Sequence, residues 1–186
     1  MPRWKRIPFL GSLLALACAT TDPSSGAMWQ SPQSSPSRPA PGPRERALLE
    51  AHNLLRAKHC APPLRWSPEV AESARRWAES LSRRGCVLDH SRGRYGENLA
   101  VATTGSLSAA EVADLWYAEV KQYRFGRSGF SMQTGHFTQL VWVGTQDLGC
   151  GVAQCQDVEV WVCQYDPPGN VEGRYEKNVL PTTCRR

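Results

Sequence analysis

The sequence predicts an α+β domain in which helices come first and antiparallel strands follow. Between residues 43 and 119, apolar residues recur every three or four positions in three stretches, the spacing of helices with one buried face. Between residues 148 and 165, the pattern changes to two runs rich in β-branched and aromatic residues. These runs are separated by Gln156-Asp157, a pattern typical of a β-hairpin. Helices followed by antiparallel strands favour a layered α+β arrangement.

The first helix is expected from about Pro43 to Lys58. Proline suits the first helical turn because its missing N–H would have no partner there. The helix should stop at Cys60-Ala61-Pro62-Pro63, since proline cannot continue it. Its buried face is predicted to hold Leu48, Ala51, His52 and Leu55.

The second and third helices carry start signals of their own. Ser67-Pro68 combines a capping residue with a proline at the first helical position, and Gly85 marks the end of that helix. Ser108 followed by Glu111 is a capping box that opens the third helix. The predicted buried positions are Val70, Ala74, Trp77 and Leu81 in the second helix, and Val112, Leu115, Trp116 and then Glu119 in the third.

The N-terminal 43 residues show no such periodicity. Residues 1–19 begin with Arg3, Lys5 and Arg6 and continue with an apolar run to Ala17 that is too short to span a bilayer. This pattern indicates a signal peptide for export. Residues 20–43 are rich in Ser and Pro, so we expect a flexible, partly extended linker. The folded domain is then expected over residues 44–186.

The charge of the chain argues against a nucleic-acid partner. The formal net charge is +5, from 22 Lys and Arg against 17 Asp and Glu. Three of the basic residues belong to the signal peptide, and without them 19 basic residues face 17 acidic ones, a balance of +2. A domain so close to neutral lacks the basic surface that nucleic-acid binding requires.

The seven cysteines divide into one at the signal peptide and six downstream. Cys18 resembles the lipid-modified cysteine of a bacterial lipoprotein, which would give the protein a lipid anchor in the membrane. The alternative is cleavage after Ala17-Cys18-Ala19 by an ordinary signal peptidase, which would discard Cys18. The even downstream set suggests three disulfides, and the lack of a C-x-x-C pair argues against cysteine-bound metal. These six are Cys60, Cys86, Cys150, Cys155, Cys163 and Cys184.

Four polar residues stand out as candidates for a functional site. Glu119 falls on the predicted buried face of the third helix, where a carboxylate is costly unless it is paired or bound to a cation. The alternative is a position at the edge of that face, with the carboxylate reaching water. His136 adjoins a strongly apolar run, Glu97 follows Gly96, and His90 lies near them in the sequence.

Two histidines and two carboxylates could together hold a divalent metal ion. Imidazole would serve as ligand, and a carboxylate as ligand or general base. The spacing of His90, Glu97, Glu119 and His136 matches no compact metal motif. His52 and His59 carry no mark of a ligand at all.

Several of these segments resemble the CAP superfamily, also called the SCP domain. That family includes cysteine-rich secretory proteins, antigen-5 venom allergens and plant pathogenesis-related proteins. The resemblance covers about residues 45–180, and the leader suggests an exported member of bacterial type. The matching segments are 96–100, 116–119, 135–142, 149–153 and 162–170, with Ala51-His52-Asn53, Arg56 and residues 88–91 in support.

The resemblance implies a three-layer α-β-α sandwich with a central antiparallel sheet, stapled by disulfides and holding an open cleft. It implies that His90, Glu97, Glu119 and His136 form a cleft tetrad, in which the two histidines bind a divalent cation, with zinc the expected ion. It also implies the disulfides Cys86–Cys155 and Cys150–Cys163, and leaves Cys60 to pair with Cys184.

The expected function is that of an exported, non-catalytic binding module. Its ligand would be a small hydrophobic molecule such as a lipid or sterol, or its partner an extracellular protein. The first alternative is a metal-dependent hydrolase of peptide or ester bonds, using the same tetrad. A serine hydrolase with Ser91 as nucleophile is a further alternative, as is a domain whose carboxylates serve only to hold the fold.

Overall fold

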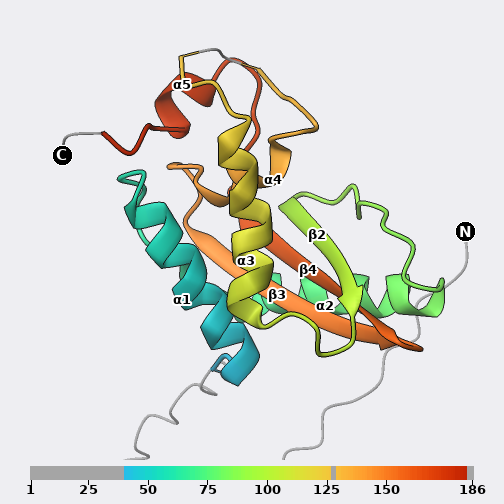
Figure 1. Cartoon of the computed structure of the whole chain (residues 1–186). Helices are drawn as coiled ribbons and strands as arrows, with labels where there is room; N and C mark the ends of the chain where they lie inside the picture. The colour runs from blue at the N-terminus through green and yellow to red at the C-terminus, as the bar shows by residue number, and fades with distance from the viewer. Residues whose placement is uncertain (1–39, 127–128, 184–186) are drawn as a thin grey trace, which may run out of the picture. The chain divides into compact units, whose positions relative to one another are not determined.

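The computed structural model describes residues 40–126 and 129–183 (Figure 1). They belong to one unit, Arg38–Arg186. The predicted signal peptide, Cys18 and nearly all of the predicted linker lie outside the described residues. No helix within the described ranges is long and apolar enough to cross a membrane. The elements in chain order are α1 (Pro43–Ala57), β1 (Arg65–Trp66), α2 (Pro68–Arg83), β2 (Gly96–Thr103), α3 (Ala109–Tyr117), the 3-10 helix η1 (Ala118–Lys121), α4 (Gly135–Leu140), β3 (Asp147–Cys155), β4 (Val158–Asp166) and α5 (Tyr175–Asn178).

The sheet is built around the predicted hairpin. β3 and β4 pair antiparallel along their whole length, from Asp147 opposite Asp166 to Cys155 opposite Val158. β2 pairs antiparallel with the other side of β4, and the two-residue β1 pairs parallel with the start of β3. The strand order is therefore β1-β3-β4-β2, and β2 forms one edge of the sheet.

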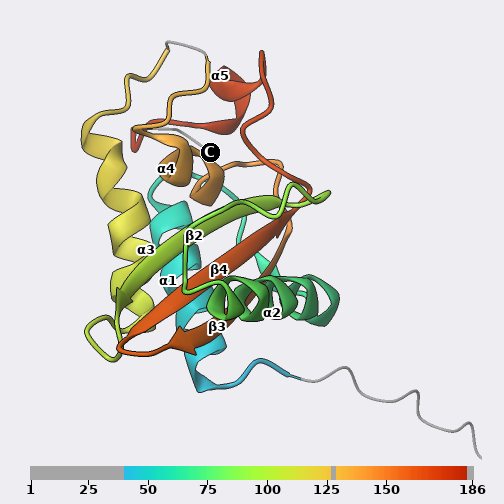
Figure 2. The same cartoon turned by 90° about the vertical axis from the view of Figure 1, so that its right-hand side faces the viewer.

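Helices cover both faces of this sheet, as Figure 2 shows. On one face lies α2, which packs against β3 and β4. On the other lie α1 and α3, which also pack against each other. The predicted α-β-α sandwich is confirmed.

Two glycines let α2 lie directly on the sheet. A Cβ atom at Gly149 would stand 2.0 Å from the backbone nitrogen of Ala71, and one at Gly151 would stand 2.4 Å from Cα of Arg75. Any other residue at either position would have to push the helix away. This close contact encloses a small apolar core that includes Leu81.

The larger core lies on the opposite face, between the sheet and α1, α3 and α4. Trp161, Cys163 and Tyr165 of β4 point into it and are fully buried. Alternate residues of the same strand point toward α2, as a pleated strand requires. The buried residues contributed by α1 and α3 include Leu48, Leu55, Val112 and Trp116.

A buried arginine organises one end of this core. Arg56 has no exposed surface, and its guanidinium donates to the backbone carbonyls of Pro62, Leu140, Trp142 and Thr145. Burial lowers its pKa to about 10. These bonds fix the end of α1 against α4 and the turn that follows it.

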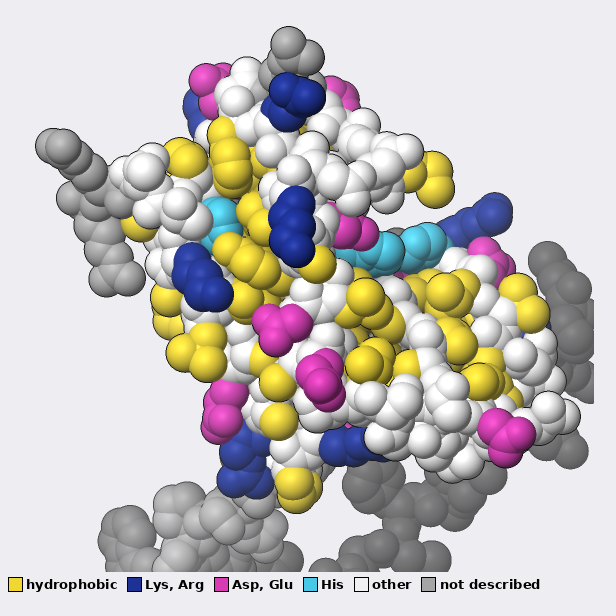
Figure 3. Space-filling model, in the orientation of Figure 1, with side chains coloured by type: hydrophobic (Ala, Val, Ile, Leu, Met, Phe, Trp, Pro, Cys, Tyr) yellow, Lys and Arg dark blue, Asp and Glu magenta, His cyan; other side chains and the backbone are white. Residues whose placement is uncertain are grey.

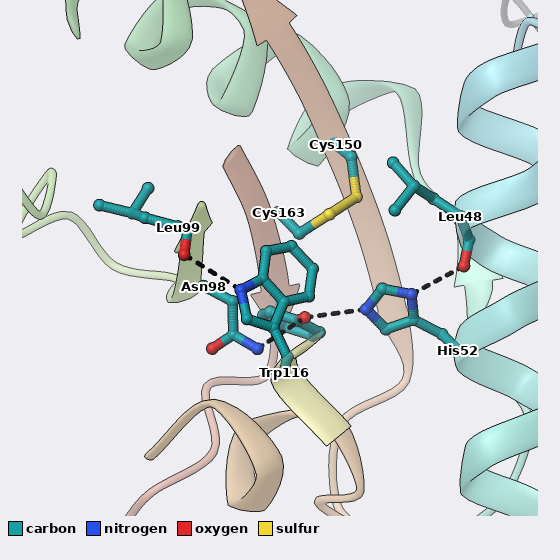
Figure 4. The surroundings of a disulfide bond; sticks show 8 residues. Leu48, His52, Asn98, Leu99, Trp116, Cys150 and Cys163 are labelled. Carbon is teal, nitrogen blue, oxygen red and sulfur yellow. Dashed lines mark hydrogen bonds between the residues drawn. A yellow bond between two sulfur atoms is a disulfide. The ribbon is translucent and has the colours of Figure 1, made fainter. Parts of the chain in front are cut away.

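Disulfides join the strands and the loops as the family resemblance implied. Cys150 and Cys163 face each other across β3 and β4 and are bonded, as Figure 4 shows. Cys86 is bonded to Cys155 and ties the loop after α2 to the end of β3. Cys60 is also disulfide-bonded, while its predicted partner Cys184 lies outside the described residues.

The structure differs from the sequence expectations at the end of α3. The helix stops at Tyr117, and Glu119 lies in the 3-10 turn that follows it. The side chain of Leu115, predicted to be buried, is half exposed because Ala113 occupies the buried face instead. The capping box of Ser108 and Glu111 is present as predicted.

Candidate functional site

His136 and Glu119 form the first of two histidine–carboxylate pairs. Oε1 of Glu119 lies 2.6 Å from Nδ1 of His136. Oε2 of the same carboxylate accepts the backbone N–H groups of His136 and Phe137 at 2.9 and 3.1 Å. Glu119 therefore binds the first turn of α4 and sets the orientation of the imidazole at the same time. Its side chain is 18% exposed, so the alternative in which it only reaches water does not describe it.

His90 and Glu97 form the second pair. Nδ1 of His90 lies 2.9 Å from Oε1 of Glu97, which also accepts the backbone N–H of Ser91. The other carboxylate oxygen accepts the amide of Gln164 at 2.9 Å. The Glu97 side chain is nearly buried, at 5% exposure, whereas that of His90 is 59% exposed.

Each member of this second pair stabilises the charged form of the other. The hydrogen bond that His90 donates to the Glu97 carboxylate raises the pKa of His90 above its usual value. Burial alone would raise the pKa of Glu97, but its bonds to His90, Gln164 and Ser91 outweigh burial and lower it. The carboxylate is therefore ionised near neutral pH and favours a proton on the imidazole.

Strand β2 brings the two pairs to the same end of the sheet. Glu97 belongs to this edge strand, and its side chain lies on the face that carries α2. Its neighbour Asn98 lies on the opposite face and donates to the backbone carbonyl of His136 at 3.0 Å. The two pairs thus flank the first residues of the edge strand β2.

A chain of buried hydrogen bonds connects this site to the core. Asn98 also donates to the hydroxyl of Tyr165, at 3.1 Å. That hydroxyl lies 2.9 Å from Nε2 of His52, whose Nδ1 lies 2.7 Å from the carbonyl oxygen of Leu48. Figure 4 shows the chain beside the Cys150–Cys163 disulfide.

Sequence reasoning did not assign roles to Asn98 or Gln164. Both are polar residues inside apolar strands, at 0% and 2% exposure. A buried amide in a strand needs hydrogen-bond partners, and here the partners are His136 and Glu97. A polar residue inside an apolar strand is therefore the sequence signal that could have identified Asn98 and Gln164.

The surface around the two pairs is hollowed. Glu119 and His136 line a pocket of about 400 Å³ whose apolar wall is made by Leu99, Leu115 and Trp116. In Figure 3, histidine and acidic side chains are exposed along a hollow on this face. The partners of Glu97, namely Ser91 and Gln164, line a different pocket with Arg94 and Tyr95.

Each pair leaves one imidazole nitrogen without a partner among the described residues. With Nδ1 engaged by a carboxylate, each ring presents Nε2 as its coordinating atom, the usual arrangement of metal-bound histidine. No three His, Cys, Asp or Glu side chains are grouped as a metal cluster in residues 40–126 and 129–183. The predicted tetrad is thus two histidine–carboxylate pairs, in which the carboxylates orient the histidines.

Comparison with known proteins identifies the family. The model of the cysteine-rich secretory protein family, CAP, matches residues 49–165, more than half of the chain. The chain belongs to the CAP family. It is 43% identical over 141 residues to the human Golgi-associated plant pathogenesis-related protein 1, an alignment that covers 72% of this chain and 90% of that protein.

Other CAP proteins show the same likeness. Pathogenesis-related protein 1C of Nicotiana tabacum is 42% identical over 134 residues, covering 70% of this chain and 79% of the tobacco protein. Among solved structures, the crystal structure of NaASP2 with Zn2+ matches with a TM-score of 0.59 at 26% identity, over 77% of this chain and 90% of that one. The two relatives in sequence come from a human and a plant, so they give no support to the bacterial type predicted from the leader.

Proposed function

We propose that this CAP-domain protein is an exported, non-catalytic binding module whose cleft holds a divalent cation, with zinc the first choice. One observation carries the proposal. Both cleft histidines use Nδ1 on a carboxylate, which leaves Nε2 of His90 and His136 as the coordinating atoms.

The number of ligands favours binding over catalysis. Catalytic zinc sites usually have three protein ligands and one open position. Here His90 and His136 supply two, so the remaining positions would be filled by water or by the bound partner. The NaASP2 crystal structure with Zn2+, a relative in fold at 26% identity, supports zinc as the ion.

The pocket beside the cation supports a hydrophobic ligand. Leu99, Leu115 and Trp116 give it an apolar wall, while Glu119 and His136 provide polar groups at one end. A lipid or sterol with a single polar group has this distribution of chemistry. An extracellular protein that places an apolar side chain in the same pocket is the other partner in this proposal. Export itself rests on the leader and on the likeness to secreted plant pathogenesis-related proteins.

Calorimetry with zinc tests the cation site. We expect the wild-type chain to bind one equivalent, and the double variant His90→Ala/His136→Ala to bind at least a hundredfold more weakly. Arg83→Ala is the control, because this side chain is exposed at the end of α2 and no described hydrogen bond or ion pair joins it to either pair. Equal zinc affinity of the double variant and the wild type would refute the site.

The same two proteins separate binding from hydrolysis. The zinc-loaded wild type should release no product from peptide or ester substrates beyond the double variant. Turnover by the wild type that disappears in the double variant would show that the protein is a metal-dependent hydrolase and not a non-catalytic binding module. Partition of a labelled sterol onto the wild type, reduced by Leu115→Asp in the pocket wall, would support the hydrophobic ligand.

A further inference from the structure

Strand β3 has one edge that is only partly paired. β1 lies beside it at Asp147 and Leu148 alone. The backbone N–H of Ser67 then donates to the carbonyl of Leu148 at 2.9 Å, and Pro68 turns the chain into α2. β3 continues to Cys155, so the rest of this edge has no neighbouring strand within the described ranges.

The alternation of the strand shows which backbone groups face this edge. The backbone N–H of Ser67 donates to the carbonyl of Leu148, so within β3 the even-numbered residues point their backbone groups away from β4. Cys150 agrees, because its Cα lies 4.1 Å from that of Cys163, the short spacing of a pair that exchanges no backbone hydrogen bonds. The carbonyl of Gln154 also points outward, where it accepts the hydroxyl of Ser82.

Two residues therefore present unpaired backbone groups between these bonded positions. Cys150 and Val152 each direct one N–H and one C=O to the open edge, and no described residue bonds to these four groups. Cys150 is 3% exposed, so its backbone groups lie below the surface. A backbone group that is shielded from water needs a hydrogen-bond partner, so this edge favours a partner that can satisfy all four groups.

A groove gives access to them. A hollow of about 480 Å³ has residues 150–152 as its floor, the first turn of α1 on one side and Trp66 with α2 on the other. Both arginines of its walls are already paired with carboxylates of the domain. Arg44 pairs with Glu159 at 2.9 Å, and Arg75 pairs with Glu72 at 2.7 Å. In Figure 2, β3 forms the margin of the sheet away from β2.

We propose that this groove binds an extended, uncharged peptide segment of another protein, which adds a short strand to β3. An extended backbone carries one donor and one acceptor on alternate residues of each edge, the same spacing that Cys150 and Val152 present. A helix has already used its own backbone groups and cannot supply them. An apolar side chain of the peptide would lie against Trp66. The site is at the opposite edge of the sheet from the cleft and does not depend on a cation there.

Hydrogen exchange and calorimetry on the full chain test the proposal. The probe is acetyl-Thr-Val-Thr-Val-Thr-amide, and its analogue with every backbone amide N-methylated is the matched control. We expect the probe to bind and to slow exchange of the Cys150 and Val152 amides at least tenfold. The amides of Gly151 and Ala153, which point to β4, should be protected already and should not change. The methylated peptide should bind at least tenfold more weakly.

A pair of variants tests the same edge from the protein side. Val152→Pro removes an outward N–H without removing a bond to β4, and should weaken probe binding at least tenfold, whereas Val152→Thr keeps the N–H and should bind as the wild type does. If Val152→Pro fails to fold, the methylated peptide and the exchange data decide. Absence of binding, or equal binding of the methylated peptide, overturns the proposal. Protection of both amides in the free chain also overturns it, because the edge would then be occupied by the chain's own N-terminal segment or by a second copy.

Discussion

The four histidines of the described residues fall into two environments that differ in their hydrogen-bond partners. His52 and His59 have no exposed surface, and both ring nitrogens of each are hydrogen-bonded, one to a backbone carbonyl and one to a tyrosine hydroxyl. His90 and His136 lie at the cleft, and only Nδ1 of each has a partner among the described residues, a carboxylate in both cases. The same residue type serves the core in one environment and presents a free nitrogen in the other.

Burial acts on the two core rings, whereas a carboxylate acts on His90. Burial lowers the pKa of His52 to about 4 and also lowers that of His59, so both are neutral at physiological pH. The carboxylate of Glu97 raises the pKa of His90. A neutral ring with both nitrogens occupied can hold the fold but cannot bind a ligand, whereas a ring held through one nitrogen can do both.

The largest expected effect is on stability, from the core. His52→Ala should lower the free energy of unfolding by about 3 kcal/mol or more, because it opens a cavity and leaves the buried hydroxyl hydrogen of Tyr165 without its acceptor. His90→Ala should change it by no more than about 0.5 kcal/mol, because that side chain is largely exposed. Urea unfolding followed by tryptophan fluorescence measures both. Equal losses in the two variants would contradict the division into two environments.

The pH dependence of stability should come next in size. The folded pKa of His52, about 4, lies below its unfolded value of 6.5, so its contribution is fully present above pH 6.5 and is lost as the pH falls toward 4. The loss should reach about 3 kcal/mol over that range. Urea unfolding at a series of pH values measures it. A His52→Gln variant should show a shallower dependence, and an unchanged slope would rule out this buried ring as the cause.

Substitution of the cleft carboxylate Glu119 should have a smaller effect on stability and a larger effect on zinc binding. Glu119→Gln replaces one of two acceptor oxygens by a donor that faces backbone N–H groups, and should cost about 1–2 kcal/mol. It should also weaken zinc binding by about 10- to 100-fold, because the orientation of His136 depends on the carboxylate. Glu176→Gln, at an exposed position in α5, should change neither. Full zinc affinity in Glu119→Gln would show that the carboxylate does not orient the ligand.

The sequence predicted the parts of the fold whose causes are local. The caps at Ser67 and Ser108 place two helices correctly, and the two runs around Gln156-Asp157 form the hairpin. The edge strand β2 was not predicted, because it shows no clear alternation between polar and apolar residues. It forms because β4 offers a partner along its whole length.

The sequence could predict which residues form the site, but not how they are arranged. The family resemblance selected His90, Glu97, Glu119 and His136, but their division into two pairs on either side of β2 depends on packing. Glu119 reaches His136 because α3 ends at Tyr117 and the 3-10 turn redirects its side chain toward α4. No pattern in the neighbouring residues specifies that contact.

The hydrogen-bond chain from α1 to the cleft has a fixed direction. Both of its ends, the carbonyls of Leu48 and His136, can only accept, so Asn98 must donate at one end and Nδ1 of His52 at the other. The hydroxyl of Tyr165 must then donate to Nε2 of His52, and a single tautomer of that ring is allowed. A proton cannot be passed along such a chain, because reversing it would require a carbonyl to donate. The chain instead fixes the main chain of His136 relative to the core. A substitution of His52 in α1 would therefore shift His136, a cleft residue that His52 is not hydrogen-bonded to.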